Sequence, residues 1–545
     1  MKAHRPAQHP AQHPAVAGAR HTGQRARRGL VAAFLAVGLS WLAGCGSLPA
    51  ATERPNSSAW PARPGSALAQ IAHNSTPSAE LSGFRLMPLG VYALDARLQL
   101  INRAVQSIDV QYYVLDNDAT GRLLLSRLAD AASRGVRVRL LVDDLYTTHS
   151  DSMLRALAEL PNVQVRLFNP FCCARSSGLA GRFAASLLDV RRLNHRMHNK
   201  LLVADGAMAI AGGRNIADDY FQRGAAYNFV DLDALIVGPV VTELATSFDQ
   251  YWNSPVVLPI QAVSPSPDAP DILRGRFDAL TSDARSAPAL DLPEVDALGY
   301  GPVSDELDAG RLGLVWGRAM ALADPPDKLA RDADKAYADS LAYQVLMKIW
   351  TAERDVTITS PYLIPGPLGI AAFEALGQRH VKVTVLTNSL AATDEPLVHT
   401  GYSRYRPRLI DAGVALYELS PSRTQRNKRL GLFGSSVGRL HAKTAVVDGD
   451  KTFFGSMNLD PRSRTQNTEL GVFVESEALA KEMLRVIKIS KLQNAYRVQK
   501  GAAGQLQWLA VEDDQNVVTD SEPESSIWLQ LHNLVFGAFV PEQLL

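Results

Sequence analysis

The chain has 545 residues, which is too long for one ordinary domain and long enough for two hydrophobic cores. Hydrophobic residues make up 46% and charged residues 20%, so neither general disorder nor a polytopic membrane protein fits. Lysine and arginine number 56 against 55 aspartates and glutamates, a balance without the strong positive field of most nucleic-acid-binding proteins. The composition therefore predicts a folded body of at least two domains and no nucleic-acid partner.

The first 45 residues have the pattern of a secretory signal. Basic residues between Arg20 and Arg28 precede an apolar stretch, 30–42, that is short for a membrane span. Small residues before Cys45 resemble the lipobox of bacterial lipoproteins, in which the signal is removed and the cysteine carries lipid. We therefore expect residues 1–45 to be a lipoprotein-type signal peptide. An uncleaved membrane anchor and a signal without lipid are the alternatives.

All three readings of this segment place the body outside the cytoplasm. We expect the protein to face the periplasm of a bacterial cell envelope and to be held on a membrane, anchored through Cys45. Gly46 and Ser47 follow the cysteine, and the absence of aspartate there favours the outer membrane.

The next segments predict a tether and then an α/β lobe. Residues 46–80 are rich in Pro, Ser and Ala without periodicity, which is typical of a flexible tether. From residue 81 onward, strands alternate with helices, as in α/β proteins. Strands are predicted at 108–115, 136–142, 163–168, 200–204 and 208–211, and a helix at 119–134. We assign residues 81–253 to an N-terminal lobe.

A Pro-, Ala- and Asp-rich stretch interrupts this alternation, and we expect residues 254–325 to cross from one lobe to the other. The alternation then resumes, with helices predicted at 336–352 and 368–377 and strands at 355–360, 381–386 and 414–419. We expect residues 326–498 to form a C-terminal lobe and residues 499–545 a tail. Two apolar segments, 181–188 and 527–540, are candidates for membrane contact, and packing on the protein's own body is the alternative.

One motif, His-x-Lys-x4-Asp, begins at His198 and again at His441. A Gly-rich turn and an asparagine follow each copy at the same offset, because 441 − 198 and 458 − 215 both equal 243. A single copy would be weak evidence for a site, since three fixed positions recur by chance. Two copies, both extended in the same way, indicate a duplicated site. The residues of the two copies are His198, Lys200, Asp205 and Asn215, and His441, Lys443, Asp448 and Asn458.

The spacing of the motif predicts how its side chains lie. Successive side chains of a strand alternate, so the histidine and lysine of each copy face the same side. A duplicated chain can fold its halves face to face about a pseudo-two-fold axis and bring both pairs together. That pocket suits one phosphate diester.

Transfer of a phosphodiester needs a nucleophile, a proton for the departing alkoxide, and positive donors around the oxygens. One histidine can attack phosphorus to give a phosphohistidine while the other protonates the leaving oxygen. We expect Lys200, Lys443, Asn215 and Asn458 to hold the phosphate oxygens. No metal or other cofactor is expected, since two ammonium groups provide the charge and no Cys/His cluster has zinc-site spacing.

A histidine that acts in one tautomer needs its far nitrogen held, usually by a carboxylate. Glu469 and Asp233 follow their motifs at places where a strand could carry them beneath the histidines, so we predict that they orient the rings. Asp205 and Asp448 complete the catalytic motif. We expect them to brace loops or pair with nearby cations rather than to touch substrate.

The duplicated motif, extended by the segment 455–463 (GSMNLDPRS) and by Asn467-Thr468-Glu469, resembles the phospholipase D superfamily and its bacterial cardiolipin synthase branch. The resemblance covers roughly residues 81–498 and implies two similar α/β/α sandwich lobes related by a pseudo-two-fold axis. It implies transfer of a phosphatidyl group to the head-group hydroxyl of phosphatidylglycerol, with phosphatidylethanolamine as the expected donor. It also implies His198 as nucleophile and His441 as acid and base.

Other functions remain open at this point. A hydrolytic phospholipase D that releases phosphatidic acid would share every catalytic residue. A phosphodiesterase acting on nucleic acid is disfavoured by the near-neutral charge and the secretory signal. A lipid-binding module without catalysis would leave two intact motifs unexplained. The sequence carries no prediction of oligomeric state.

Overall fold

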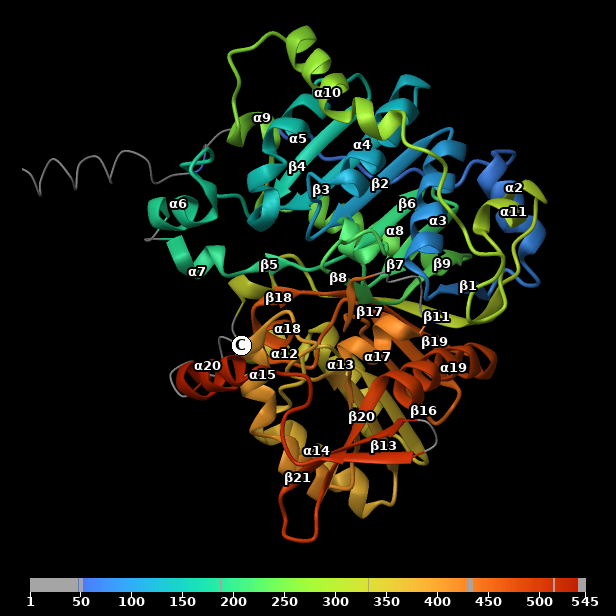
Figure 1. Cartoon of the computed structure of the whole chain (residues 1–545). Coiled ribbons are helices and arrows are strands. Elements are labelled where there is room, and N and C mark those ends of the chain that lie inside the picture. Colours follow the sequence, from blue (N-terminus) through green and yellow to red (C-terminus); the bar gives the residue numbers. More distant parts are fainter. Residues whose placement is uncertain are drawn as a thin grey trace, which may run out of the picture.

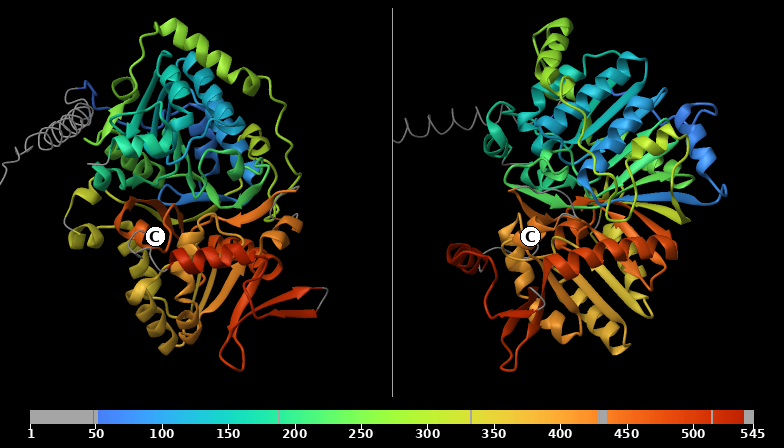
Figure 2. Two further views of the ribbon diagram at one scale, coloured as in Figure 1. Left: turned by 60° about the vertical axis from the view of Figure 1, so that its left-hand side comes forward. Right: turned by 45° about the vertical axis from the view of Figure 1, so that its right-hand side comes forward.

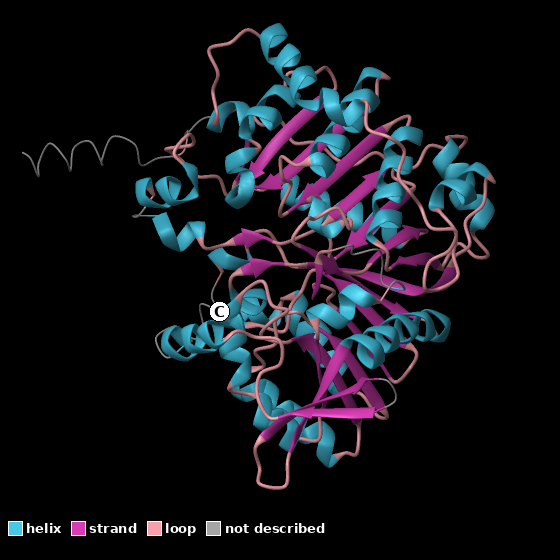
Figure 3. Ribbon diagram, viewed as in Figure 1, coloured by secondary structure: helices cyan, strands magenta, loops and turns pink. Residues whose placement is uncertain are grey.

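The computed structural model describes residues 48, 52–186, 189–331, 333–427, 429, 435–512 and 515–537. Figure 1 shows two stacked halves with strand β11 (Val315–Ala323) between them. In both halves the strands lie among helices (Figure 3), and the views of Figure 2 show the same division. The predicted signal peptide, with Cys45, lies outside the described residues.

The first half is built on one mixed sheet whose strands pair in the order β10-β4-β3-β2-β6-β7-β9-β1. The pairs β2–β3 and β3–β4 are parallel and the others antiparallel. The strands are β1 (Ser82–Met87), β2 (Ser107–Tyr112), β3 (Arg137–Asp143), β4 (Val163–Phe168), β6 (Leu201–Ala204), β7 (Met208–Gly212), β9 (Asp233–Val237) and β10 (Val257–Pro259). The helices are α2 (Ala67–Ser75), α3 (Gly90–Arg103), α4 (Ala119–Ser133), η1 (Asp144–His149), α5 (Asp151–Leu157), α6 (Gly178–Ala185), α7 (Val190–Leu193), η3 (Asp218–Tyr220), α8 (Val240–Trp252), α9 (Ile260–Val263), α10 (Pro270–Arg285) and α11 (Val303–Asp308).

The second half repeats this topology in the order β20-β14-β13-β12-β16-β17-β19-β11, again with two parallel pairs, β12–β13 and β13–β14. Its strands are β12 (Asp355–Thr359), β13 (Lys382–Asn388), β14 (Ala415–Leu419), β16 (Thr444–Val447), β17 (Lys451–Gly455), β19 (Leu470–Glu475), β20 (Ala495–Lys500), β21 (Leu506–Glu512) and β22 (Gln515–Thr519). Its helices are η4 (Lys328–Ala330), α12 (Ala333–Ala338), α13 (Leu341–Trp350), α14 (Gly366–Gln378), α15 (Pro396–Ser403), α16 (Arg406–Asp411), α17 (Pro421–Arg426), α18 (Pro461–Thr465), α19 (Glu477–Asn494) and α20 (Ile527–Gly537). The predicted duplicated α/β fold is confirmed.

The two halves share a hydrophobic core. Strands β2, β6, β7 and β9 are buried along their whole length, as expected of strands with helices on both faces. One face of the first sheet packs under α3 and α4, and the other joins the second sheet together with α8 and α19. Phe84 and Phe454, one from each sheet, meet edge to face at 6.1 Å. Burial of this apolar surface holds the halves in one relative position.

Strands also pair across the halves. β1 and β11 are antiparallel neighbours. Two short parallel pairs mirror each other: β5 (Arg196–Met197) lies beside β18 (Asn467–Thr468), and β15 (Val437–Leu440) beside β8 (Tyr227–Val230). Each pair joins a strand just before one histidine motif to a strand of the opposite half.

The prediction that residues 46–80 form a flexible tether is wrong where the described part of this segment packs on the first half. The Arg54 guanidinium donates to the carbonyl oxygens of Ser254 and Val257, and α2 buries Leu68 completely. Arg54 and the buried face of α2 fix this segment. Leu68, Ile71 and Ser75 recur at helical spacing on that face, a pattern too short to stand out among the surrounding prolines and serines.

The predicted crossover and tail also carry more structure than expected. Within 254–325, β10 pairs with β4, α10 packs on α4 and α5, and β11 pairs with β19, so the second sheet begins inside the predicted crossover. Within 499–545, β21 and β22 extend the second sheet and α20 follows. Over the residues described, no helix is both long and apolar enough to cross a bilayer.

Candidate active site

The two motif histidines sit between the halves, where the short cross-half pairs place them. His198 follows β5, and its backbone N–H donates to the carbonyl oxygen of Thr468 at 2.9 Å. His441 follows β15, and its backbone N–H donates to the carbonyl oxygen of Val230 at 2.8 Å. Each histidine is therefore fixed by a strand of the opposite half.

A carboxylate from the opposite half holds each ring. Nδ1 of His198 lies 2.9 Å from Oε2 of Glu469, and Nδ1 of His441 lies 2.6 Å from Oδ2 of Asp231. All four side chains are buried. Because Nδ1 is engaged on each ring, Nε2 remains as the nitrogen for chemistry.

The prediction that Asp233 orients a histidine is wrong, because Asp231 occupies that place. The β8–β15 pairing ends at Val230, which puts Asp231 next to His441. Asp233 instead starts β9 and forms buried ion pairs with Arg97 at 2.8 Å and Arg214 at 3.5 Å. The two orienting carboxylates share one feature: each directly follows a short strand that pairs with the opposite half. That pairing cannot be predicted from the sequence.

Burial and charge set the protonation of the two rings. Burial lowers the pKa of His198 to about 4, against the opposing pull of Glu469. Burial, with the neighbouring Lys443 ammonium, also lowers the pKa of His441. Burial would raise the pKa of Asp231, but the hydrogen bond to His441 and the charges of His441, Lys443 and Arg214 lower it to about 2. Both imidazoles are therefore neutral at neutral pH, and both carboxylates are ionised.

The two lysines lie behind the histidines of their own motifs. Nζ of Lys200 donates to the His198 carbonyl oxygen at 2.6 Å, and Nζ of Lys443 donates to the His441 carbonyl oxygen at 2.5 Å. Burial lowers the pKa of Lys443 to about 8 and lowers that of Lys200 well below its ordinary value. Lys200 also lies 5.3 Å from the centre of the Tyr113 ring.

The motif aspartates face the backbone. Asp205 accepts the N–H groups of residues 105–107, and Asp448 accepts those of residues 353–355. Both have a positive φ, 52° and 53° respectively, at the turn that ends the motif strand. Neither lines the cavity described below, as expected of residues that brace loops.

The two motif asparagines both line that cavity and differ in their bonds. Oδ1 of Asn215 accepts from the Val114 N–H, and its Nδ2 donates to the Tyr220 hydroxyl. Oδ1 of Asn458 is buried and has no hydrogen-bond partner within the described part of the chain.

A cavity of about 630 Å³ lies between the halves and is lined by both His198 and His441. Aromatic rings surround the histidines: Tyr113 lies 5.0 Å from His198, and Tyr220 and Phe229 lie 5.1 and 4.9 Å from His441. Charged side chains also line it. The sequence alone left open whether Asp460 and Arg462 contact substrate, and it singled out none of the others for this role: Asp116, Asp219, Asp394, Glu395 and Arg196. They come from five places in the two halves, namely β5, η3, α18 with its N-cap, the loop at Asp116 and the loop that holds both Asp394 and Glu395, so no local pattern marks them.

The positive charge near the histidines comes from side chains, namely Lys200, Lys443, Arg196 and Arg462. Across the residues that the structure describes, no group of three or more His, Cys, Asp or Glu side chains is arranged to hold a metal ion.

Comparisons with known proteins give a consistent result. A domain family described as "Cardiolipin synthase, PLD-like domain" matches residues 98–252 and 345–489. The chain is 39% identical over 440 residues to cardiolipin synthase C of Escherichia coli, covering 80% of this chain and 90% of that protein. It is 25% identical to a cardiolipin synthase of Staphylococcus aureus, covering 72% of this chain and 64% of that protein.

A solved structure has the same fold. Phosphatidylserine synthase of Haemophilus influenzae aligns with a TM-score of 0.53 at 12% identity, covering 88% of this chain and all of that one.

Proposed function

The chain belongs to the cardiolipin synthase family with PLD-like domains, and from this premise we propose that it is a phosphatidyltransferase that makes cardiolipin. The proposed acceptor is phosphatidylglycerol, and the proposed donor of the phosphatidyl group is a second phospholipid, phosphatidylethanolamine. One observation carries the proposal: two histidines, each paired with a carboxylate of the opposite half, line a single cavity.

In the proposed first step, Nε2 of His198 attacks the donor's phosphorus. A bond forms between nitrogen and phosphorus while the bond to the head-group oxygen breaks, and His441 gives a proton to that oxygen. The low pKa of His198 keeps its lone pair available. The negative charge of a bound phosphodiester raises the pKa of His441 and lets it carry the proton.

In the proposed second step, His441 takes the proton of the acceptor's hydroxyl, whose oxygen then attacks phosphorus and releases His198. Lys200, Lys443, Asn215 and Asn458 are the proposed ligands of the phosphate oxygens. The ammonium groups have donors left after their bond to a backbone carbonyl, and Asn458 has an unpaired buried oxygen. Amide oxygen and nitrogen are interchangeable by rotation, so Asn458 can also present its NH₂.

The lining of the cavity supports a donor with a cationic head group. Asp394 accepts from the Tyr362 hydroxyl at 2.8 Å, and its charge acts to raise the pKa of His441. Because His441 is the proposed acid for the leaving group, the Asp394 carboxylate lies on the leaving-group side. Glu395 lies beside it, and Phe229 adds an aromatic face. Carboxylates and aromatic faces together attract an ammonium group, which phosphatidylethanolamine carries.

We further propose that the protein works on an envelope membrane, facing the periplasm and anchored through Cys45. The helix α20 supports membrane contact, because Ile527 and Trp528 are 81% and 80% exposed on it. α20 packs on α15, which lines the cavity from the second half, while α6 lines it from the first. Figures 1 and 2 show α6 and α20 on the same side of the molecule. That side is the proposed membrane face.

Lipid analysis tests the function. Purified protein and a His198→Ala variant are incubated with phosphatidylglycerol alone and then with added phosphatidylethanolamine. If the wild-type protein forms cardiolipin and the variant does not, the proposed reaction is supported. If cardiolipin also requires added phosphatidylethanolamine, the proposed donor is supported. Phosphatidic acid without cardiolipin would mean that water takes the intermediate and that the protein is a hydrolytic phospholipase D.

A further inference from the structure

A second pocket, of about 290 Å³, lies in the second half beside the catalytic cavity. Helices α13 and α14 form its apolar walls, with Leu346, Trp350 and Phe373 among the lining side chains. The rings of Trp350 and Phe373 meet edge to face at 5.1 Å. At the pocket's surface, Leu368 is 76% exposed, so the apolar lining reaches solvent.

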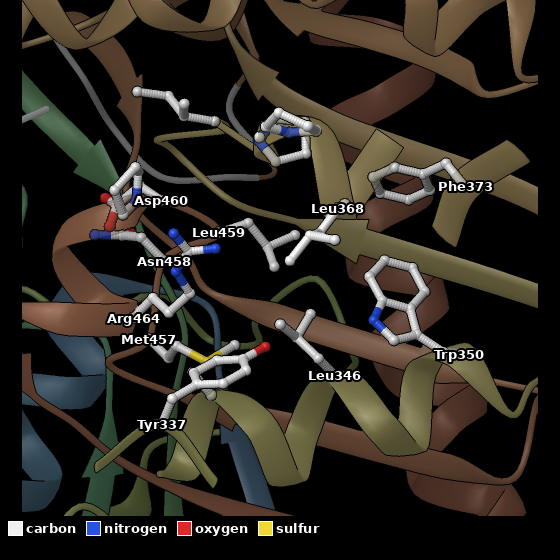
Figure 4. A pocket seen from close by; sticks show the side chains of 17 residues that line it. Tyr337, Leu346, Trp350, Leu368, Phe373, Met457, Asn458, Leu459, Asp460 and Arg464 are labelled. Atoms are coloured by element: carbon white, nitrogen blue, oxygen red, sulfur yellow. The ribbon is translucent and has the colours of Figure 1, made fainter. Parts of the chain in front are cut away.

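The pocket has a polar end and an apolar end. Figure 4 shows Asn458, Asp460 and Arg464 together at one end and the rings of Trp350 and Phe373 at the other. Asn458 and Asp460 also line the catalytic cavity, so the polar end is the wall that the two spaces share. The pocket therefore adjoins the cavity that the two histidines line.

The duplication allows the lining of the pocket to be compared with the equivalent positions of the first half. The bridge Leu115–Ile216 in the first half corresponds to Leu363–Leu459 in the second, and 459 − 216 is again 243. The same offset relates two further positions that line the pocket to Arg214 and Phe221 of the first half, because 457 − 214 and 464 − 221 equal 243.

Those two residues are packed inside the first half. Arg214 is fully buried and donates to the carbonyl oxygens of Met87 and Tyr220, and Phe221 is fully buried. In the second half, Met457 and Arg464 stand in their places and border open space. An apolar space left unfilled costs stability, because its walls lose contacts. Two equivalent positions are therefore fully buried in the first half and line an open pocket in the second, which favours a ligand there.

We propose that this pocket binds one acyl chain of the phospholipid whose phosphate lies between His198 and His441. The inference rests on the proposed function, which it deepens by assigning a chain-binding site. The polar end faces the phosphate, the apolar end suits methylene groups, and the unpaired Oδ1 of Asn458 lies at the junction, where the lipid's glycerol would pass.

The test fills the pocket and varies the chain. Leu346→Trp enlarges a side chain of the lining, whereas Met347→Trp makes a similar enlargement at the next residue, which is exposed and outside the pocket. Both variants and the wild type are assayed with dipalmitoyl and dihexanoyl phospholipids of the same head groups. We expect Leu346→Trp to reduce kcat/KM for the long-chain lipid by about tenfold, with the short-chain lipid and Met347→Trp nearly unchanged.

An equal effect of Leu346→Trp on both lipids, or none on either, would overturn the chain site while leaving cardiolipin synthesis intact. A wild type that makes no cardiolipin would instead remove the proposed function. A second measurement needs no variant: a dipalmitoyl phospholipid with a photoreactive group at the chain end is crosslinked to the wild type. Labelled residues in α13 or α14 support the site, and labelling confined to other elements overturns it.

Discussion

Replacing Glu469 by glutamine would test the carboxylate that reaches His198 from the opposite half. Glutamine keeps the size of the side chain and an oxygen for Nδ1, but it removes the charge that would stabilise the ring once phosphorus is attached. A hydrogen bond to a charged group contributes about 1.5–3 kcal/mol, and about 1.4 kcal/mol corresponds to a tenfold change in rate. We therefore expect kcat to fall by about 10- to 100-fold. Ser456 donates to the same oxygen as His198 and can donate to the glutamine oxygen, and the Ser463 hydroxyl can accept from the amide NH₂, so the replaced side chain keeps its place.

The assay is cardiolipin formation, together with a rapid-quench measurement of the phosphoenzyme from a donor labelled in its phosphate. Glu469→Gln should slow phosphoenzyme formation. Glu475→Gln, at the exposed end of the same strand, should leave both rates unchanged. Asp231→Asn, the counterpart at His441, should slow departure of the head group by a similar factor. A kcat within twofold of the wild type for folded Glu469→Gln would refute the crossed pairing as a catalytic device.

Three further predictions concern stability and membrane contact. Asp233→Asn leaves Arg97 and Arg214 without their buried partner, so denaturant unfolding should show a loss of about 3 kcal/mol, and an unchanged midpoint would contradict the ion pairs. The folded pKa of His198, about 4, lies below its ordinary 6.5, so only the unfolded chain binds the proton between these values. The free energy of unfolding should therefore fall as the pH drops from about 6.5 to about 4, and His198→Ala should reduce that slope; an equal slope would contradict the pKa. Trp528→Ser should weaken cosedimentation with lipid vesicles by about tenfold while activity on dispersed short-chain lipid stays constant, and unchanged cosedimentation would argue against α20 as a membrane contact.

The sequence by itself determined the duplicated α/β architecture and the residues most apt for phosphoryl chemistry. Strand and helix periodicities are local, so the alternation in each half could be read from the chain. The constant offset of 243 between the motifs and between Asn215 and Asn458 required two copies of one fold, and the structure has that topology twice.

Irregular segments were harder to predict, for a physical reason. The stretch around Arg54 is held by single hydrogen bonds to distant backbone carbonyls, and β11 owes its place to β1 and β19 together. Neither arrangement produces a periodic pattern of apolar residues. The sequence therefore suggested a tether and a crossover where these segments in fact pack on the two halves.

Tertiary structure alone decided which carboxylate serves which histidine and what surrounds them. Asp231 and Asp233 are two residues apart and chemically alike, and only the register of β8 against β15 puts the first beside His441. Glu469 reaches His198 in the same way, across the halves. Contacts between segments hundreds of residues apart depend on how two finished sheets pack, and no local pattern encodes that packing.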